Sequence, residues 1–218
     1  MKVFAVDGVR VGLSDKGDGN MKVSGGDASL AEVNRRRFLR GVGVESAYFV
    51  RVDYDTEDFC QFGVAGKENG LELGDEAKRC DGLLTRERGV GLFLPLGDCL
   101  GLVLYDRRAE AMMVVHCGRH TLAQDGAFEA VKFMCDAVGT GAENVVAWMS
   151  PSAGGDSYPV HDLGGVSLRE AVVEQLARAG VDEAGISGSE IDTTVDEHYF
   201  SHSQGDRDER FAIVAVID

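Results

Sequence analysis

The feature that most restricts the fold of this sequence is a series of short, almost wholly apolar segments. Six segments have the length and β-branched composition of strands, and several are apolar at consecutive rather than alternate positions. They cover residues 47–52, 90–96, 101–105, 112–116, 144–149 and 211–217. Strands of this kind are covered on both faces. The sequence therefore predicts sheets enclosed between other layers.

Three helices are predicted between these strands from capping residues and apolar spacing. The first follows the capping box Ser29-x-x-Glu32 and carries an apolar stripe before Gly41 and Gly43. The second covers residues 120–138 and stops at Gly139, and the third follows Ser167-x-x-Glu170 and stops at Gly180. The first stripe consists of Leu30, Val33, Phe38 and Leu39. Strands mixed with a few long helices indicate a layered α/β or α+β fold.

Charge and composition exclude several functional classes. The chain has 22 Lys and Arg residues against 37 Asp and Glu residues, a net charge of −15, which opposes binding to nucleic acid or to an anionic membrane. The negative net charge is compatible with a small anionic substrate bound in a local basic pocket. No apolar run approaches the ~20 residues that a membrane span needs. The apolar stretch at the N-terminus is too short for a signal peptide. The five cysteines lack a CxxC motif and favour a reducing, cytoplasmic location.

With three prolines and no long Pro- or Ser-rich linker, the sequence favours one domain over residues 1–218. Its most informative stretch lies between Gly97 and Gly118. Cys99 stands at the start of one predicted strand and His116 at the end of the next, so a hairpin would bring them within about 5 Å. A thiolate and an imidazole can bind zinc, or His116 can activate Cys99 as a nucleophile. Alternatively, both are buried core residues.

An ordered set of motifs around these residues resembles the YfiH-type family. Residues 97–106 resemble its ADC-x-P segment, 115–118 its H-A-G-W-R segment and 81–85 its A-D-G-hydrophobic-T segment. Other residues of the chain resemble N-terminal and C-terminal landmarks of the family. They are Gly19-Asn20, Gly26-Asp27, Asn34-Arg35, Tyr199-Phe200-Ser201 and Arg210. Members are often labelled laccase-domain or multicopper polyphenol oxidoreductases and are now understood as purine nucleoside phosphorylases.

The resemblance implies an α/β/β/α sandwich with mixed sheets and a zinc held by His, Cys and His. The second and third ligands fall on Cys99 and His116, whereas the first falls on Asp53 in Arg51-Val52-Asp53. A carboxylate there can ligate zinc, but it lowers the charge of the site by one unit, so bound water is polarised less. The family's later G-P-S-I-G-x-C-C-Y segment corresponds to residues 150–158, without its cysteines.

Three further residues are candidates for the site. Arg119 and His120 lie at the start of the second helix, where free N–H groups favour phosphate, and His120 is also a candidate catalytic residue. Arg210 is a candidate for binding substrate. Together with these residues, the resemblance implies a zinc-dependent purine nucleoside phosphorylase acting on adenosine or inosine and phosphate. Adenosine deamination and methylthioadenosine cleavage are associated activities of the family.

Two other hypotheses stay open. The first is a metal-free Cys/His hydrolase or amidase using Cys99 and His116, including one that edits peptidoglycan precursors. The second is a non-catalytic descendant that keeps the fold as a binding module. The sequence does not address the oligomeric state.

Overall fold

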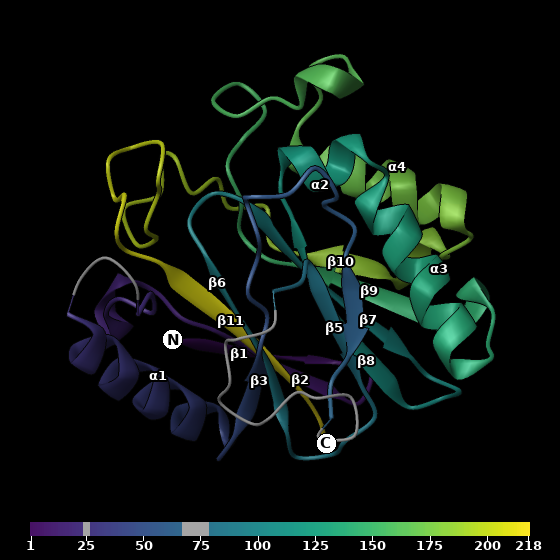
Figure 1. Ribbon diagram of the computed structural model, residues 1–218, viewed down its shortest axis with the longest axis horizontal. Coiled ribbons are helices and arrows are strands. Elements are labelled where there is room, and N and C mark those ends of the chain that lie inside the picture. Colours follow the sequence, from purple (N-terminus) through teal and green to yellow (C-terminus); the bar gives the residue numbers. More distant parts are fainter. Residues whose placement is uncertain (24–26, 67–78) are drawn as a thin grey trace.

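A computed structural model describes residues 1–23, 27–66 and 79–218 of the protein, so Gly26 of the predicted landmarks lies outside the described residues. Eleven strands of this part of the chain form two mixed sheets (Figure 1). The five-stranded sheet has the order β1 (Lys2–Val6), β2 (Val9–Leu13), β11 (Phe211–Ile217), β6 (Gly91–Leu96) and β3 (Ala47–Phe49). The six-stranded sheet has the order β10 (Ile186–Gly188), β9 (Val145–Met149), β7 (Leu100–Asp106), β8 (Ala111–Cys117), β5 (Gly82–Thr85) and β4 (Phe62–Val64).

Most strand pairs are antiparallel, and three pairs are parallel: β3 with β6, β9 with β10, and β4 with β5. The α-helices among the described residues are α1 (Ala28–Val42), α2 (Arg119–Ala123), α3 (Gly126–Val138) and α4 (Leu168–Ala179). Short 3-10 helices cover Lys16–Asp18, Ala142–Asn144, His161–Leu163 and Glu183–Gly185. None of the helices in the described part of the chain is long and apolar enough to cross a membrane.

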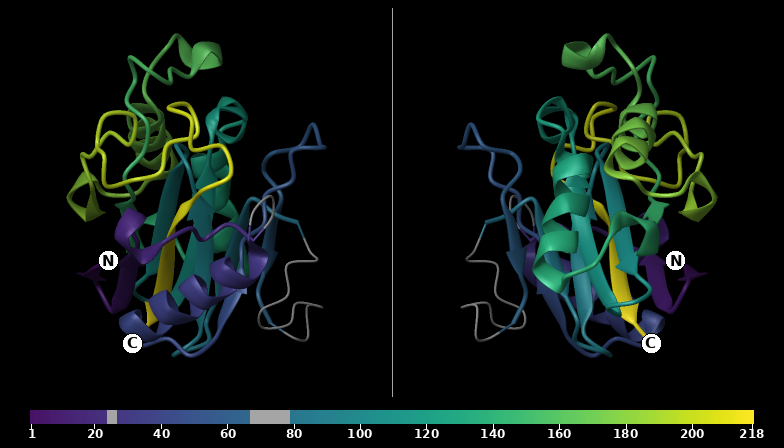
Figure 2. Two further views of the ribbon diagram at one scale, coloured as in Figure 1. Left: turned by 90° about the vertical axis from the view of Figure 1, so that its left-hand side faces the viewer. Right: turned by 90° about the vertical axis from the view of Figure 1, so that its right-hand side faces the viewer.

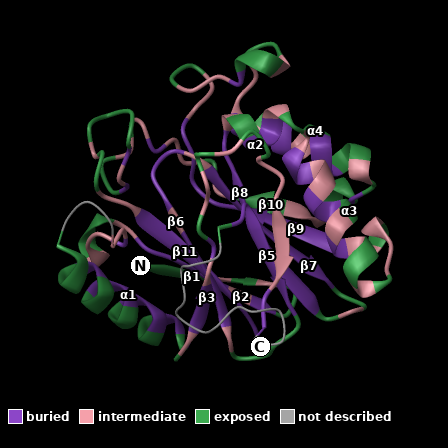
Figure 3. Ribbon diagram, viewed as in Figure 1, coloured by how far each residue is buried: buried purple, intermediate pink, exposed green. Residues whose placement is uncertain are grey.

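The elements stack in four layers, with α1 on one side of the sheets and α2, α3 and α4 on the other (Figure 2). Alternate strand residues serve different layers. In β8, Met112 and Val114 join the core between the sheets, while Met113 and Val115 face the helices. The inner strands β6, β7, β8, β9 and β11 are therefore buried on both faces (Figure 3), whereas the edge strands β1, β4 and β10 are partly exposed. The predicted α/β/β/α sandwich with mixed sheets is confirmed.

The first helix differs from the prediction at its start and on its buried face. Its N-cap is Asp27, whose carboxylate accepts a hydrogen bond from the Leu30 amide, so the predicted capping box at Ser29 is wrong. Leu30 and Val33 are exposed. The helix instead buries Ala31, Asn34, Arg35, Phe38, Leu39 and Val42, some of them against β2 at Gly12. A Cβ at Gly12 would lie 2.3 Å from Val42, so only glycine allows this approach.

The helix predicted over residues 120–138 is interrupted, and α2 and α3 are its two parts. Asp125, between them, has a φ of 60°, which an α-helix does not accommodate. The third helix begins at the predicted capping box of Ser167 and Glu170. That residues 1–218 form a single domain stays a prediction.

Candidate functional site

The predicted hairpin is present and brings the ends of β7 and β8 together. Leu100 pairs with Cys117 in the antiparallel register, so Cys99 lies opposite Gly118. A Cβ at Gly118 would lie 3.2 Å from Cys99 Sγ and 2.9 Å from His116 Cε1. The thiol and the imidazole therefore face the same small space, which a side chain at position 118 would fill. Cys117 points to the helix side of the sheet, as strand alternation requires.

Burial determines the charge states of this pair. His116 is 5% exposed, and its Nδ1 atom finds no hydrogen-bond partner among the described residues. Burial, with a contribution from the nearby Arg210 cation, lowers the pKa of His116 to about 4. Burial also raises the pKa of the Cys99 thiol to about 11. At neutral pH the pair is an uncharged imidazole beside an uncharged thiol.

A tyrosine that the sequence analysis did not single out completes this cluster. The Tyr158 hydroxyl is hydrogen-bonded with the Cys99 thiol, and burial raises the pKa of Tyr158 to about 12. Arg119 lies over the Tyr158 ring with its guanidinium carbon 4.0 Å from the ring centroid. Tyr158 ends the segment that resembles the family's G-P-S-I-G-x-C-C-Y motif, and that position was the available signal.

His116 also lines a pocket of about 540 Å³ that is rich in cations. Its described wall combines apolar and aromatic side chains, among them Phe49 and Tyr54, with five basic residues. The basic residues are Lys22, Arg35, Arg51, Arg79 and Arg210. Three described carboxylates pair with them: Asp208 with Lys22, and Asp53 and Asp55 with Arg79. Five basic residues thus line one pocket in a chain of net charge −15.

Arg210 connects this pocket to the start of β7. Its guanidinium lies against Gly97, where a Cβ would come within 3.1 Å of Nε and 3.2 Å of Cζ. Its Nη1 donates to three backbone carbonyls, the shortest bond being 2.6 Å to Glu209. Arg210 is thus held beside His116, and the substrate-binding role that the resemblance implies for it stays a prediction.

Asp53 and His120 do not join Cys99 and His116. The Asp53 carboxylate accepts hydrogen bonds from the Asp55 amide and from Arg79, which lower the pKa of its carboxyl. His120 is exposed, and its ring stacks on Phe59 with the centroids 4.9 Å apart. The roles of both residues stay predictions.

The predicted zinc ligands do not fit a three-ligand site in this arrangement. No group of three or more His, Cys, Asp or Glu side chains that could hold a metal ion occurs among the described residues. Cys99 and His116 supply two adjacent donors, but Asp53 is paired with a cation. Residues 1–23, 27–66 and 79–218 thus supply no complete ligand set, and zinc binding rests on the family resemblance alone.

Known proteins similar to this chain place it in a family. A family model described as multi-copper polyphenol oxidoreductase laccase matches residues 8–165. A Xylella fastidiosa protein named purine nucleoside phosphorylase is 28% identical, with 91% of this chain and 84% of that protein covered.

Two crystal structures share the fold. YlmD from Geobacillus stearothermophilus is 23% identical with a TM-score of 0.84, covering 96% of this chain and 92% of YlmD. The Bacillus licheniformis hypothetical protein YfiH is 18% identical with a TM-score of 0.81, covering 96% and 93% of the two chains. Because the family model spans more than half of the sequence, the chain belongs to the family described as multi-copper polyphenol oxidoreductase laccase.

Proposed function

We propose that the protein is a purine nucleoside phosphorylase that converts adenosine or inosine and phosphate into the base and ribose 1-phosphate. The observation that carries the proposal is the basic pocket beside His116. Five basic residues line this pocket, and such cationic groups suit a phosphate dianion, while the chain as a whole is strongly acidic. The name of the Xylella fastidiosa relative supports the same activity.

In this reaction a phosphate oxygen forms a bond to C1′ of the ribose as the bond from C1′ to N9 of the purine breaks. The bonding electrons leave with the base, which then takes up a proton. Guanidinium groups suit the phosphate because their N–H donors match its oxygens in pairs. Arg35 and Arg210 line the pocket and are the arginines that we assign to phosphate. Arg210 Nη1 is held by backbone carbonyls. Holding phosphate beside C1′ supplies proximity, which contributes much of the rate.

The aromatic residues of the pocket support a purine as the other ligand. Tyr54 is 67% exposed, and its ring meets the His116 ring edge to face at 6.3 Å between centroids. Phe49 lines the same pocket. Flat aromatic faces bind a base by stacking. We assign Tyr54 and Phe49 to the base and the arginines to phosphate.

The hydrolase hypothesis requires a Cys99 thiolate at neutral pH, because the thiolate is the nucleophile. Burial of the thiol acts against that state, and the uncharged His116 does not offset it. No observation on the described residues favours hydrolysis over phosphorolysis. Zinc takes no part in the steps above, and elemental analysis of the purified protein tests its presence separately.

The test is release of hypoxanthine from inosine and of adenine from adenosine, with and without phosphate. We expect base release that depends on phosphate and an equal amount of ribose 1-phosphate. Arg210→Ala should lower the rate, whereas Arg108→Ala, an exposed arginine at the opposite end of the β7–β8 hairpin, should not. Base release that is independent of phosphate would contradict phosphorolysis, and no release would favour the binding-module hypothesis.

A further inference from the structure

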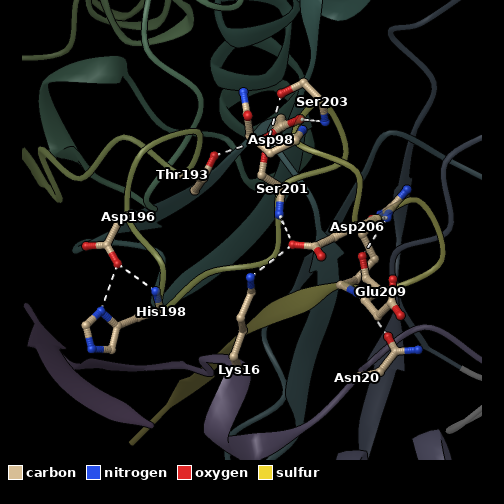
Figure 4. A network of polar contacts seen from close by, with 12 residues as sticks. Lys16, Asn20, Asp98, Thr193, Asp196, His198, Ser201, Ser203, Asp206 and Glu209 are labelled. Atoms are coloured by element: carbon tan, nitrogen blue, oxygen red, sulfur yellow. Dashed lines mark hydrogen bonds and ion pairs between the residues drawn. The ribbon is translucent and has the colours of Figure 1, made fainter.

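One buried carboxylate organises the loop that leads into the pocket. Asp98, directly before Cys99, is 4% exposed. Its Oδ1 accepts hydrogen bonds from the hydroxyls of Thr193 at 3.1 Å and Ser201 at 2.7 Å, and its Oδ2 accepts from the Ser203 amide at 2.8 Å (Figure 4). A carboxylate with three donors in a buried position fixes the segments that supply them.

The contacts continue from Ser201 to the carbonyls that bind Arg210. The Ser201 amide donates to the Asp206 carboxylate at 3.0 Å, and the Asp206 amide donates to the Ser201 carbonyl at 3.0 Å. Lys16 also pairs with the Asp206 carboxylate (Figure 4). This closed turn presents the carbonyls of Asp206 and Arg207, which with that of Glu209 accept from Arg210 Nη1.

The backbone of Arg210 is held by other residues. Its amide donates to the Asn20 side chain at 2.9 Å, and its carbonyl accepts from the Met21 amide at 2.9 Å. The loop that Asp98 fixes therefore determines the direction of the guanidinium rather than the path of the chain. Gly97, next to Asp98, supplies the surface on which that guanidinium lies.

We propose that Asp98 is a positioning residue that holds the Arg210 guanidinium in the pocket through the 201–206 turn. This inference rests on the proposed function in that Arg210 is taken to bind phosphate. Asp98 itself does not line the pocket. Its effect on phosphate must therefore pass through the loop, and removing Arg210 must abolish it.

The test is a double-mutant cycle read out by calorimetric titration of the full chain with inorganic phosphate. In Asp98→Asn one carboxylate oxygen becomes an NH₂ group, which cannot accept a hydrogen bond. If the remaining oxygen accepts from the Thr193 and Ser201 hydroxyls, the hydrogen bond from the Ser203 amide is lost. We expect phosphate to bind about tenfold more weakly, the order expected for one charge-assisted hydrogen bond. In the Arg210→Ala background the same change should have an effect of less than about twofold. Equal effects in both backgrounds would overturn the proposal.

Two further variants separate positioning from damage to the fold. Asp196→Asn also removes a loop carboxylate. Among the described residues its hydrogen bonds come from His198 and not from the turn that holds Arg210, so phosphate affinity should not change. Gly97→Ala leaves the Asp98 contacts intact and places a Cβ against Arg210, so affinity should fall by about threefold. If Asp98→Asn does not fold, Gly97→Ala provides the test. Unchanged phosphate affinity in Gly97→Ala would overturn the proposal that the Arg210 guanidinium, held on Gly97, binds phosphate.

A readout without phosphate distinguishes failure of this inference from failure of the proposed function. The rate at which phenylglyoxal modifies Arg210, followed by peptide mass analysis, should rise about threefold in Asp98→Asn because the turn no longer holds the guanidinium. If the wild type binds no phosphate but Arg210 is modified faster in Asp98→Asn, the proposed function fails and the positioning role of Asp98 stands. An unchanged rate would overturn the positioning role.

Discussion

Arg35 provides the sharpest mutational test of the pocket. It is 7% exposed, and its guanidinium carbon lies 4.8 Å from the Phe49 ring centroid and 5.1 Å from that of Phe93. Its Nε donates to the Met21 carbonyl at 2.6 Å. A buried arginine held this way serves both the fold and the charge of the pocket. Arg35→Met keeps most of the volume but removes the charge and the donors.

The expected cost follows from these contacts. Leaving the buried Met21 carbonyl without Nε costs about 1–3 kcal/mol, and each ring contact is worth about 0.5–1 kcal/mol. Relief from burying a charge offsets part of this sum. We expect a net loss of about 2 kcal/mol, which lowers the melting temperature by about 4–8 °C in a chain of this size. Phosphate affinity should fall at least about tenfold.

Arg35→Lys is the matched comparison, because it keeps the charge and loses the planar ring contacts. Its stability should fall nearly as far as that of Arg35→Met, while phosphate affinity falls only about threefold. Urea unfolding followed by fluorescence of Trp148, which is 4% exposed, measures the first quantity, and calorimetry with phosphate measures the second. Wild-type phosphate affinity in Arg35→Met would refute the assignment of this pocket to phosphate.

Three other outcomes follow from the structure. His120→Ala should change phosphate affinity by less than about twofold in the same titration, because the ring stacks on Phe59 at the surface; a larger loss would restore His120 to the site. Gly12→Ala should lower the free energy of unfolding by about 1–3 kcal/mol in urea, because the new methyl group meets Val42; unchanged stability would contradict this close approach. The Glu170 carboxylate accepts from the Ser167 amide and hydroxyl, which lower the pKa of its carboxyl below 4.5. Its stabilisation of α4 is therefore complete above the ordinary pKa of a glutamate and is lost as the pH falls through the lowered value. Urea unfolding between about pH 3 and 6 should show a smaller loss of stability on acidification for Glu170→Gln than for wild type. Equal losses would count against the capping contact.

The layered fold was predictable because its inner strands are buried on both faces and their apolar runs are continuous. The β1–β2 hairpin was missed, since β1 lies at a sheet edge and its residues are partly exposed. Its signal was Asp7-Gly8, a two-residue turn in which both residues have positive φ. The interruption between α2 and α3 also falls at an Asp-Gly pair, Asp125-Gly126, and apolar periodicity alone did not reveal it.

The site was predictable only in part. Adjacent strands joined by a short turn placed Cys99 near His116, because local pairing fixes that distance. The basic residues of the pocket come from positions as far apart as Lys22 and Arg210, and no spacing in the sequence indicates that they meet. The pairing of Asp53 with Arg79 likewise depends on tertiary contacts.

The most direct measurement of the central claim is a reaction of inosine with phosphate labelled with ¹⁸O at all four oxygens, in unlabelled water. Phosphorolysis joins a phosphate oxygen to C1′, so ribose 1-phosphate should carry all four labelled oxygens in its mass spectrum and in its ³¹P resonance shift. Hydrolysis would instead give free ribose with an oxygen from water and leave the labelled phosphate unchanged. The first result is the one that the basic pocket beside His116 predicts, and the second would contradict it.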